Sequence, residues 1–152
     1  MPISHPFHIQ IYCGDEGDPE QPDDAEKSFE YEGLAIPRGR AAAEPGYFAC
    51  SFEQWMETLH AWPNTYSEGD GSWSWVADEL DDRRQPTWRI EGMVYDRGGR
   101  VFYVEAQGAC TPAAWWQIVA ALPVPPDKRL AICLAKYGVW VEQDDFGEWI
   151  QN

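Results

Sequence analysis

The stretch that decides the predicted fold is Ala49-Cys-Ser-Phe-Glu-Gln-Trp55, because it opens a helix and has a counterpart later in the chain. The Ser51 hydroxyl can accept a hydrogen bond from the backbone N–H of Gln54, whose side chain can reach back to the backbone of Ser51. Apolar residues then recur on one face of a helix, at Phe52, Trp55, Met56 and Leu59. Because proline cannot continue a helix, we expect this helix to end before Pro63.

The counterpart is Ala109-Cys-Thr-Pro-Ala-Ala-Trp115. A threonine replaces the capping serine, and Pro112 stands at the first helical position, where its missing N–H costs nothing. This second predicted helix extends to Leu122 and is apolar nearly all round, so we expect it to be deeply covered. Trp55 and Trp115 occupy the same position in the two helices, and we expect both rings in the core.

Shorter sequence segments that resemble each other precede the two helices, in the same order in both halves. Glu32-Gly-Leu-Ala is followed by Arg38-Gly-Arg40, and Glu91-Gly-Met-Val is followed by Arg97-Gly-Gly-Arg100. The shared order predicts a tandem duplication of a βββα unit, with copies at about 6–63 and 72–123. The alternative is convergence on common capping rules, although those rules do not demand the Ala-Cys or Glu-Gly pairs.

Alternation of apolar and polar residues predicts strands elsewhere in the chain. Phe7 to Cys13 is the plainest case, and Asp96-Arg-Gly-Gly-Arg100 predicts a hairpin turn because glycine supplies the positive φ that it needs. The other expected strands are 29–36, an extended piece ending at 47–50, 73–76, 88–95, 101–106, 129–135 and 139–142. We therefore predict one α+β domain over 1–152. Its mixed or mostly antiparallel sheet of about eight strands carries two helices on one face and ends in a strand pair over 129–142.

The chain carries a large negative charge, because 26 acidic residues against 11 basic residues give a net charge of −15. Nucleic acids and anionic membranes need basic patches, so the charge argues against both as partners. The longest apolar stretch, Pro112 to Pro126, is also too short to span a bilayer. The charge favours a basic protein partner, metal cations or simply solubility, and nothing in the sequence indicates the oligomeric state.

Many of the acidic residues gather in three segments, each of which follows a predicted strand. They are Asp15, Glu16, Asp18, Asp23 and Asp24; Asp78, Glu79, Asp81 and Asp82; and Asp144 and Asp145. If the three strands run in the same direction, these segments fall along one rim of the sheet. Such a rim accelerates encounter with a basic partner by roughly 10–10³-fold at low salt, so we predict that these residues bind the partner. None has the spacing of a calcium-binding loop, and a solvated acidic surface is the alternative.

The usual motifs of catalysis are absent from the sequence. It holds no H-E-x-x-H, G-x-S-x-G or P-loop pattern, and its four cysteines include no C-x-x-C pair. Residues 1–6 lack the basic and apolar regions of a secretory signal, so we expect a cytoplasmic protein whose thiols stay reduced and are buried as small apolar residues. We predict no catalytic residue, no metal site and no cofactor.

Three tryptophans, Trp73, Trp75 and Trp140, have two possible roles. In Trp73-Ser-Trp75 both rings lie on one side of the predicted strand, with serines on the other. Burial in the core is the ordinary role of such residues, and an aromatic face for binding is the alternative.

These observations favour a non-enzymatic acidic protein-binding module, an inhibitor that occupies the active surface of a basic protein. In size, charge and lack of catalytic motifs the chain is similar to small acidic immunity proteins of bacteria, which implies that it neutralises its partner. One alternative is a small-molecule- or metal-binding domain, or an enzyme, that uses a tryptophan-lined groove with carboxylates at its mouth. Another is mimicry of nucleic-acid phosphates, which requires regularly spaced carboxylates on one face.

Overall fold

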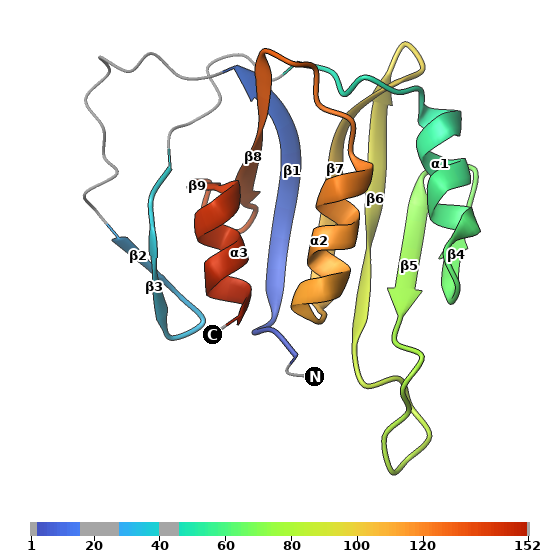
Figure 1. Cartoon of the computed structure of the whole chain (residues 1–152), viewed down its shortest axis with the longest axis vertical. Helices are drawn as coiled ribbons and strands as arrows, with labels where there is room; N and C mark the ends of the chain where they lie inside the picture. The colour runs from blue at the N-terminus through green and yellow to red at the C-terminus, as the bar shows by residue number, and fades with distance from the viewer. Residues whose placement is uncertain (1–2, 16–27, 40–45, 152) are drawn as a thin grey trace.

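The computed structural model describes residues 3–15, 28–39 and 46–151, which form three helices and nine strands (Figure 1). The helices are α1 (Phe52–Ala61), α2 (Pro112–Ala121) and α3 (Gln143–Gln151). The strands are β1 (Phe7–Asp15), β2 (Ser28–Tyr31), β3 (Leu34–Pro37), β4 (Thr65–Ser67), β5 (Ser72–Val76), β6 (Arg89–Arg97), β7 (Arg100–Ala109), β8 (Lys128–Leu134) and β9 (Val139–Glu142).

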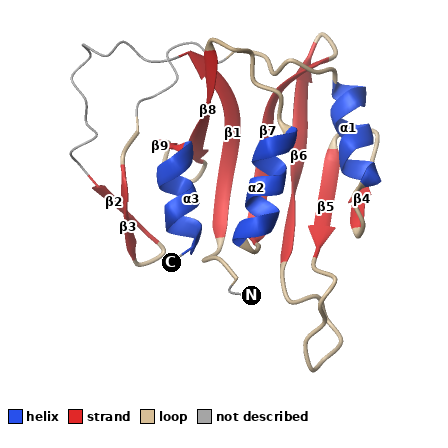
Figure 2. Ribbon diagram, viewed as in Figure 1, coloured by secondary structure: helices blue, strands red, loops and turns tan. Residues whose placement is uncertain are grey.

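Seven of the described strands form one antiparallel sheet in the order β4-β5-β6-β7-β1-β8-β9. β1 is hydrogen-bonded to β7 on one side and to β8 on the other, so the first strand of the chain joins two later hairpins. β2 and β3 pair with each other in a two-stranded sheet, and β3 packs against α3 (Figure 2). The α+β class and the mostly antiparallel sheet predicted from the sequence are confirmed.

The core lies between the large sheet and the helices, all three of which cover the same face of the sheet (Figure 1). Alternate residues of β1, from Phe7 to Cys13, are buried on this face. The ring of Trp115 on α2 packs against the ring of Phe146 on α3, with centroids 4.7 Å apart. Phe146 also meets Phe7 at 5.7 Å. These contacts join the second helix, the third helix and the central strand.

The two helices predicted from the sequence form within the expected limits. Both hydrogen bonds of the Ser51 capping box are present, and Thr111 accepts a hydrogen bond from the backbone N–H of Ala114. Trp55 and Trp115 are both buried, as their matching positions predicted.

A third helix, α3, adds to the predicted two. Its buried apolar residues, Phe146, Trp149 and Ile150, have the spacing of one helix face, but this pattern covers little more than one turn. Gly147 interrupts it, and a side chain there would come within 2.6 Å of the Trp116 ring. The glycine that weakens the sequence signal is thus the residue that lets α2 and α3 pack closely.

The tandem duplication is not confirmed. The helical parts of the two units match, but β2 and β3 lie outside the large sheet, whereas β6 and β7 lie within it. Glu32 and Gly33 form a turn with φ of 49° and 82°, which divides the strand expected over 29–36 into a hairpin. Gly92, the predicted equivalent of Gly33, lies inside β6. β4 is a further addition, in a segment that is not among the strands expected from the sequence.

Candidate functional site

The strand directions do not meet the condition under which the acidic segments were expected along one rim of the sheet. β1 and β9 run in the same direction, but β5 runs opposite to both. Asp78, Glu79, Asp81 and Asp82 therefore follow a strand that ends at the opposite end of the sheet from Asp15 (Figure 1). Glu16, Asp18, Asp23 and Asp24 lie outside the described residues. The condition on which the rim depended, a common strand direction, is not met for β5.

Several of the predicted acidic residues have local structural roles. The Asp81 carboxylate accepts hydrogen bonds from the backbone N–H groups of Arg83 and Gln85, at 2.8 Å and 3.0 Å, which shapes the loop between β5 and β6. Asp144 and Asp145 stand in the first turn of α3, where a negative charge stabilises the helix. Burial, followed by three neighbouring carboxylates, raises the pKa of Asp145. Within the described ranges, no group of three or more His, Cys, Asp or Glu side chains could hold a metal ion.

The three singled-out tryptophans lie on two different faces of the sheet. Trp73 and Trp75 are 4% and 8% exposed and belong to the core, so they form no binding face. The ring of Trp75 contacts the rings of Trp62 and Trp88 at 4.9 Å and 5.2 Å, which contributes to its burial. Trp140 is half-buried on the opposite face, next to Tyr12.

A row of aromatic side chains crosses the sheet face opposite the helices, and no described helix packs over it. Tyr95 stacks on Tyr103 at 4.3 Å, Tyr103 stacks on Tyr12 at 4.8 Å, and Tyr12 meets Trp140 at 5.4 Å. Burial, followed by its tyrosine neighbours, raises the pKa of Tyr103 to about 12. The Tyr103 hydroxyl therefore stays protonated near neutral pH.

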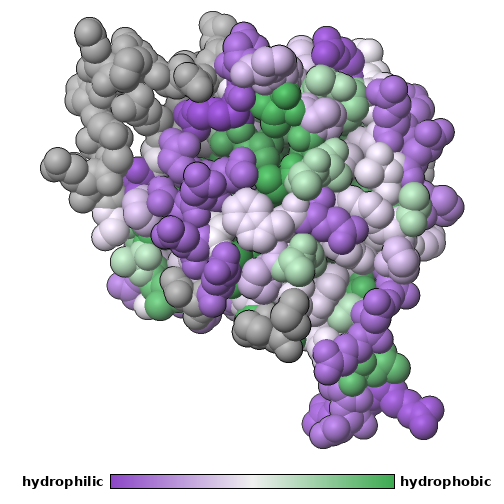
Figure 3. Space-filling view, in the orientation of Figure 1, coloured by the Kyte–Doolittle hydropathy of each residue, from purple (hydrophilic) through white to green (hydrophobic). Residues whose placement is uncertain are grey.

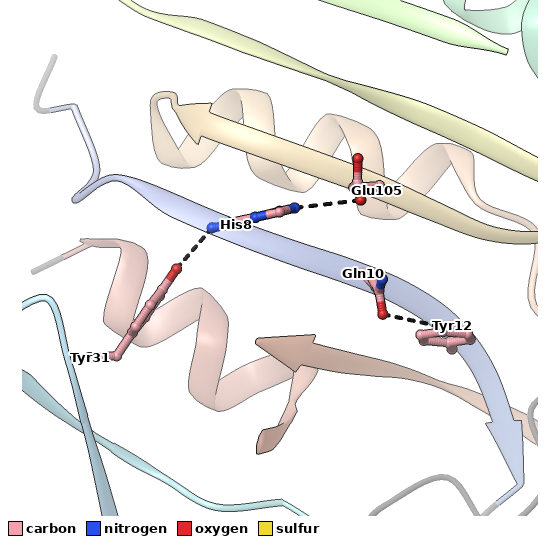
Figure 4. Close-up of polar contacts among 5 residues, drawn as sticks. All are labelled: His8, Gln10, Tyr12, Tyr31 and Glu105. Atoms are coloured by element: carbon pink, nitrogen blue, oxygen red, sulfur yellow. Dashed lines mark hydrogen bonds and ion pairs between the residues drawn. The ribbon is translucent and has the colours of Figure 1, made fainter. Parts of the chain in front are cut away.

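Acidic side chains beside this aromatic row lie close to arginine or histidine side chains. His8 Nε2 lies 3.5 Å from Glu105 Oε2 across β1 and β7, and Figure 4 shows the histidine ring directed at the carboxylate. The backbone N–H of His8 donates to the Tyr31 hydroxyl at 2.8 Å. Arg129 and Glu142 pair at 2.9 Å, and Arg89 and Glu91 pair at 3.4 Å. Two arginines thus offset two glutamates on this face, which lowers its electrostatic preference for a basic partner.

A groove between α1 and the β4–β5 turn, which we call the α1–β4 groove, has unbalanced charge. Its volume is about 480 Å³. The lining residues are Phe52, Glu53, Met56, Glu57, His60, Ala61, Ser67, Glu68 and Gly69. Phe52 and Met56 give it apolar surface and three glutamates stand around it, and none of the lysines and arginines that the structure describes lines it. The glutamates and His60 are exposed, and Figure 3 shows hydrophilic residues along the outer side of α1.

Local hydrogen bonds hold the two walls of this groove. The Thr65 hydroxyl donates to the Leu59 carbonyl, which fastens β4 to the end of α1. The backbone N–H of Glu68 donates to the Ser72 carbonyl at 2.9 Å and closes the β4–β5 turn. Gly71 has a φ of 97°, and a side chain there would collide with the Val94 carbonyl, so glycine permits this turn.

The cysteines behave as buried apolar residues. Cys13, Cys110 and Cys133 are buried, Cys50 is partly buried, and all four are free thiols. Burial raises the pKa of each thiol, and that of Cys110 reaches about 12. Such thiols stay protonated and are poor nucleophiles.

Sequence reasoning missed the groove because its signals are divided between two segments. Glu53 and Glu57 look like an ordinary solvated helix face, and Glu68 lies in a polar turn. The helix pattern places Phe52 and Met56 on the edge of the apolar face, next to these glutamates. The helix residues and the turn residues form one surface only because β4 lies beside α1 in the fold.

None of the described helices is long and apolar enough to cross a membrane. Comparisons with protein-family models, curated proteins and solved structures gave no match to this chain.

Proposed function

We propose that this protein is a non-enzymatic acidic protein-binding module that neutralises a basic partner, and that the α1–β4 groove binds that partner. The observation that carries the proposal is the make-up of the groove: apolar side chains on α1, three surrounding glutamates and no lysine or arginine. Among the described surfaces considered above, this one combines apolar contact with charge of one sign.

Each part of the groove supports a different aspect of binding. Burial of Phe52 and Met56 against an apolar partner residue supplies affinity. Glu53, Glu57 and Glu68 select a partner with lysine or arginine around that residue and repel acidic competitors. The net charge of −15 extends this preference over the whole surface and speeds encounter at low salt. The same charge opposes binding to nucleic acid and anionic membranes.

A photo-crosslinking experiment tests the proposal. A photoreactive phenylalanine derivative replaces Met56 in the groove, and a second protein carries it in place of Trp116, on the exposed side of α2. Both are expressed in the source cells, and crosslinked proteins are identified by mass spectrometry. We expect a protein of net positive charge to crosslink at position 56 and not at 116, and the yield to fall at high salt.

A matched pair of variants gives the control. Glu53→Gln/Glu57→Gln/Glu68→Gln removes three charges at the groove, and Glu30→Gln/Glu79→Gln/Glu148→Gln removes three exposed charges elsewhere. The first should abolish the crosslink and the second should retain most of it. Crosslinks only to acidic proteins, or equal loss in the two triple variants, would refute the groove as the partner site.

The alternative of a ligand-binding domain or enzyme with a tryptophan-lined groove has less support, because Trp73 and Trp75 are buried. The observation in its favour is a cavity of about 270 Å³ beside His8, Tyr31 and Lys136. A specific change in tryptophan fluorescence with one member of a metabolite and metal panel would favour it.

A further inference from the structure

We infer that the partner segment binds as an extended strand that adds antiparallel to β4, with every second residue apolar and lysine or arginine between and beside them. This inference rests on the proposed function and specifies how the α1–β4 groove is filled.

β4 forms one end of the seven-stranded sheet, and no described strand pairs with its outer side. The other end is different, because the backbone N–H of Gly39 donates to the Trp140 carbonyl on β9 at 2.7 Å. Edge strands are often protected by proline or lysine. β4, with the sequence Thr-Tyr-Ser, contains neither.

The register of β4 and β5 determines which backbone groups face outward. The N–H of Glu68 donates to Ser72, and the N–H of Val76 donates to Asn64. In an antiparallel ladder, hydrogen-bonded residues alternate with residues whose backbone groups point away from the partner strand. The N–H and C=O groups of Thr65 and Ser67 therefore point away from β5, toward the open edge.

The same alternation places the groove beside those groups. Thr65 and Ser67 pair with Trp75 and Trp73, whose side chains are buried on the helix-covered face. Residues of an added strand that lie opposite Thr65 and Ser67 would point their side chains to this face, toward α1. There they would meet the apolar surface of the groove, which includes Phe52 and Met56.

The charges account for the remaining positions of the added strand. Tyr66 lies on the other face of the sheet edge, and its hydroxyl bonds at 2.9 Å to the carboxylate of Glu68, a residue that also lines the groove. A lysine or arginine between two apolar residues would reach Glu68. Glu53 and Glu57 stand on α1, beside the apolar positions, and add negative potential that favours a basic segment as a whole. A helix in the groove would leave the outward groups of Thr65 and Ser67 without protein partners, so the structure favours a strand.

The probe is the peptide acetyl-Lys-Leu-Lys-Val-Lys-Leu-Lys-amide, with two N-methylated forms. In antiparallel addition the apolar residues point their N–H groups at β4, and the lysines point theirs away. Backbone N-methylation of the leucines and valine should weaken binding at least about tenfold, because it removes the inter-strand hydrogen bonds. N-methylation of the inner lysines should leave the affinity within about threefold, because it alters only the outer edge.

Amide exchange of the protein provides a second readout that needs no variant. Binding of the unmodified peptide should slow exchange at Thr65 and Ser67, and the peptide with N-methylated apolar residues should not. Concentration-dependent protection of these amides in the free protein would assign the edge to a second copy of the chain and overturn the inference.

The outcomes separate the two proposals. Strand addition is wrong if both N-methylated peptides bind as tightly as the unmodified peptide. The proposed function still stands in that case if Glu53→Gln/Glu57→Gln/Glu68→Gln weakens the binding of all three peptides. If the peptide does not bind, or binds the triple glutamine variant equally well, both are overturned.

Discussion

The hydroxyl of Thr65 donates a hydrogen bond of 2.6 Å to the carbonyl of Leu59. The same hydroxyl lies 2.8 Å from the carbonyl of Trp62. Both carbonyls belong to the end of α1, where helical carbonyls lack partners within the helix. One side chain thus fixes the position of the edge strand relative to the helix, and with it the width of the α1–β4 groove.

Thr65→Val should lower the free energy of unfolding by about 1 kcal/mol, because it removes the hydroxyl without much change of shape. Urea denaturation, monitored by tryptophan fluorescence, measures this change in the free energy of unfolding. Thr58→Val is the control, because the Thr58 hydroxyl bonds only to the Gln54 carbonyl of its own helix. Equal effects of the two substitutions would show that the Thr65 bond does not fasten β4.

Trp115→Ala should lower the free energy of unfolding by roughly 3–5 kcal/mol, because the ring fills the space between α2, α3 and β1. Trp115 is fully buried, whereas its neighbour Trp116 is 36% exposed. Trp116→Ala should therefore lower the free energy of unfolding clearly less, although the native Trp116 ring rests against Gly147. Thermal and urea unfolding of both variants provide the comparison, and an unshifted melting temperature for Trp115→Ala would contradict its place in the core.

Gly92→Ala should cost about 3 kcal/mol or more, since the added methyl group collides with the Glu105 carbonyl on β7. The neighbouring atoms are backbone, so the strands must separate to make room. Gly69→Ala is the matched control, because nothing lies within 4 Å of a methyl group there. Gly69→Ala should change the free energy of unfolding by no more than about 0.5 kcal/mol. The β6–β7 packing described here would be wrong if circular dichroism and urea unfolding found the two variants alike.

Stability should fall in strongly alkaline solution through Cys110. Burial raises the pKa of its thiol from 9.0 to about 12, so between these values the unfolded chain releases a proton that the folded chain keeps. The free energy of unfolding therefore falls as pH rises, by up to about 1.4 kcal/mol per pH unit from this group, and the thiol's contribution is complete below pH 9.0. Cys110→Ala should have a shallower decline in urea unfolding between pH 9 and 12. An unchanged slope would mean that other groups cause the loss.

The sequence predicted the elements whose signals are local. The N-cap residues of α1 and α2 and the apolar residues that follow them lie within a few positions of one another, and the Gly98-Gly99 turn lies between the strands that it joins. Which strands share a sheet depends on contacts between distant segments, and the tandem duplication predicted from short sequence matches is not confirmed. Glu32-Gly33 and Glu91-Gly92 have the same letters, but one pair makes a turn and the other lies within a strand.

The candidate site shows the same limit. Acidic segments that follow strands are visible in the sequence, but whether the strands run in the same direction is set by the order of the sheet. The side of the sheet on which Trp73 and Trp140 lie likewise depends on where the helices pack. The groove residues of α1 were visible as a helix face, yet only the fold brings Ser67 and Glu68 beside them.

Gly39 has a consequence for which edge of the sheet can pair with another strand. A side chain at this position would come within 2.8 Å of the backbone nitrogen of Glu142, so only glycine lets the segment lie against β9. The backbone hydrogen bond that this segment makes to the Trp140 carbonyl occupies part of the β9 edge. A strand that joins the described sheet should therefore add at β4 and not at β9.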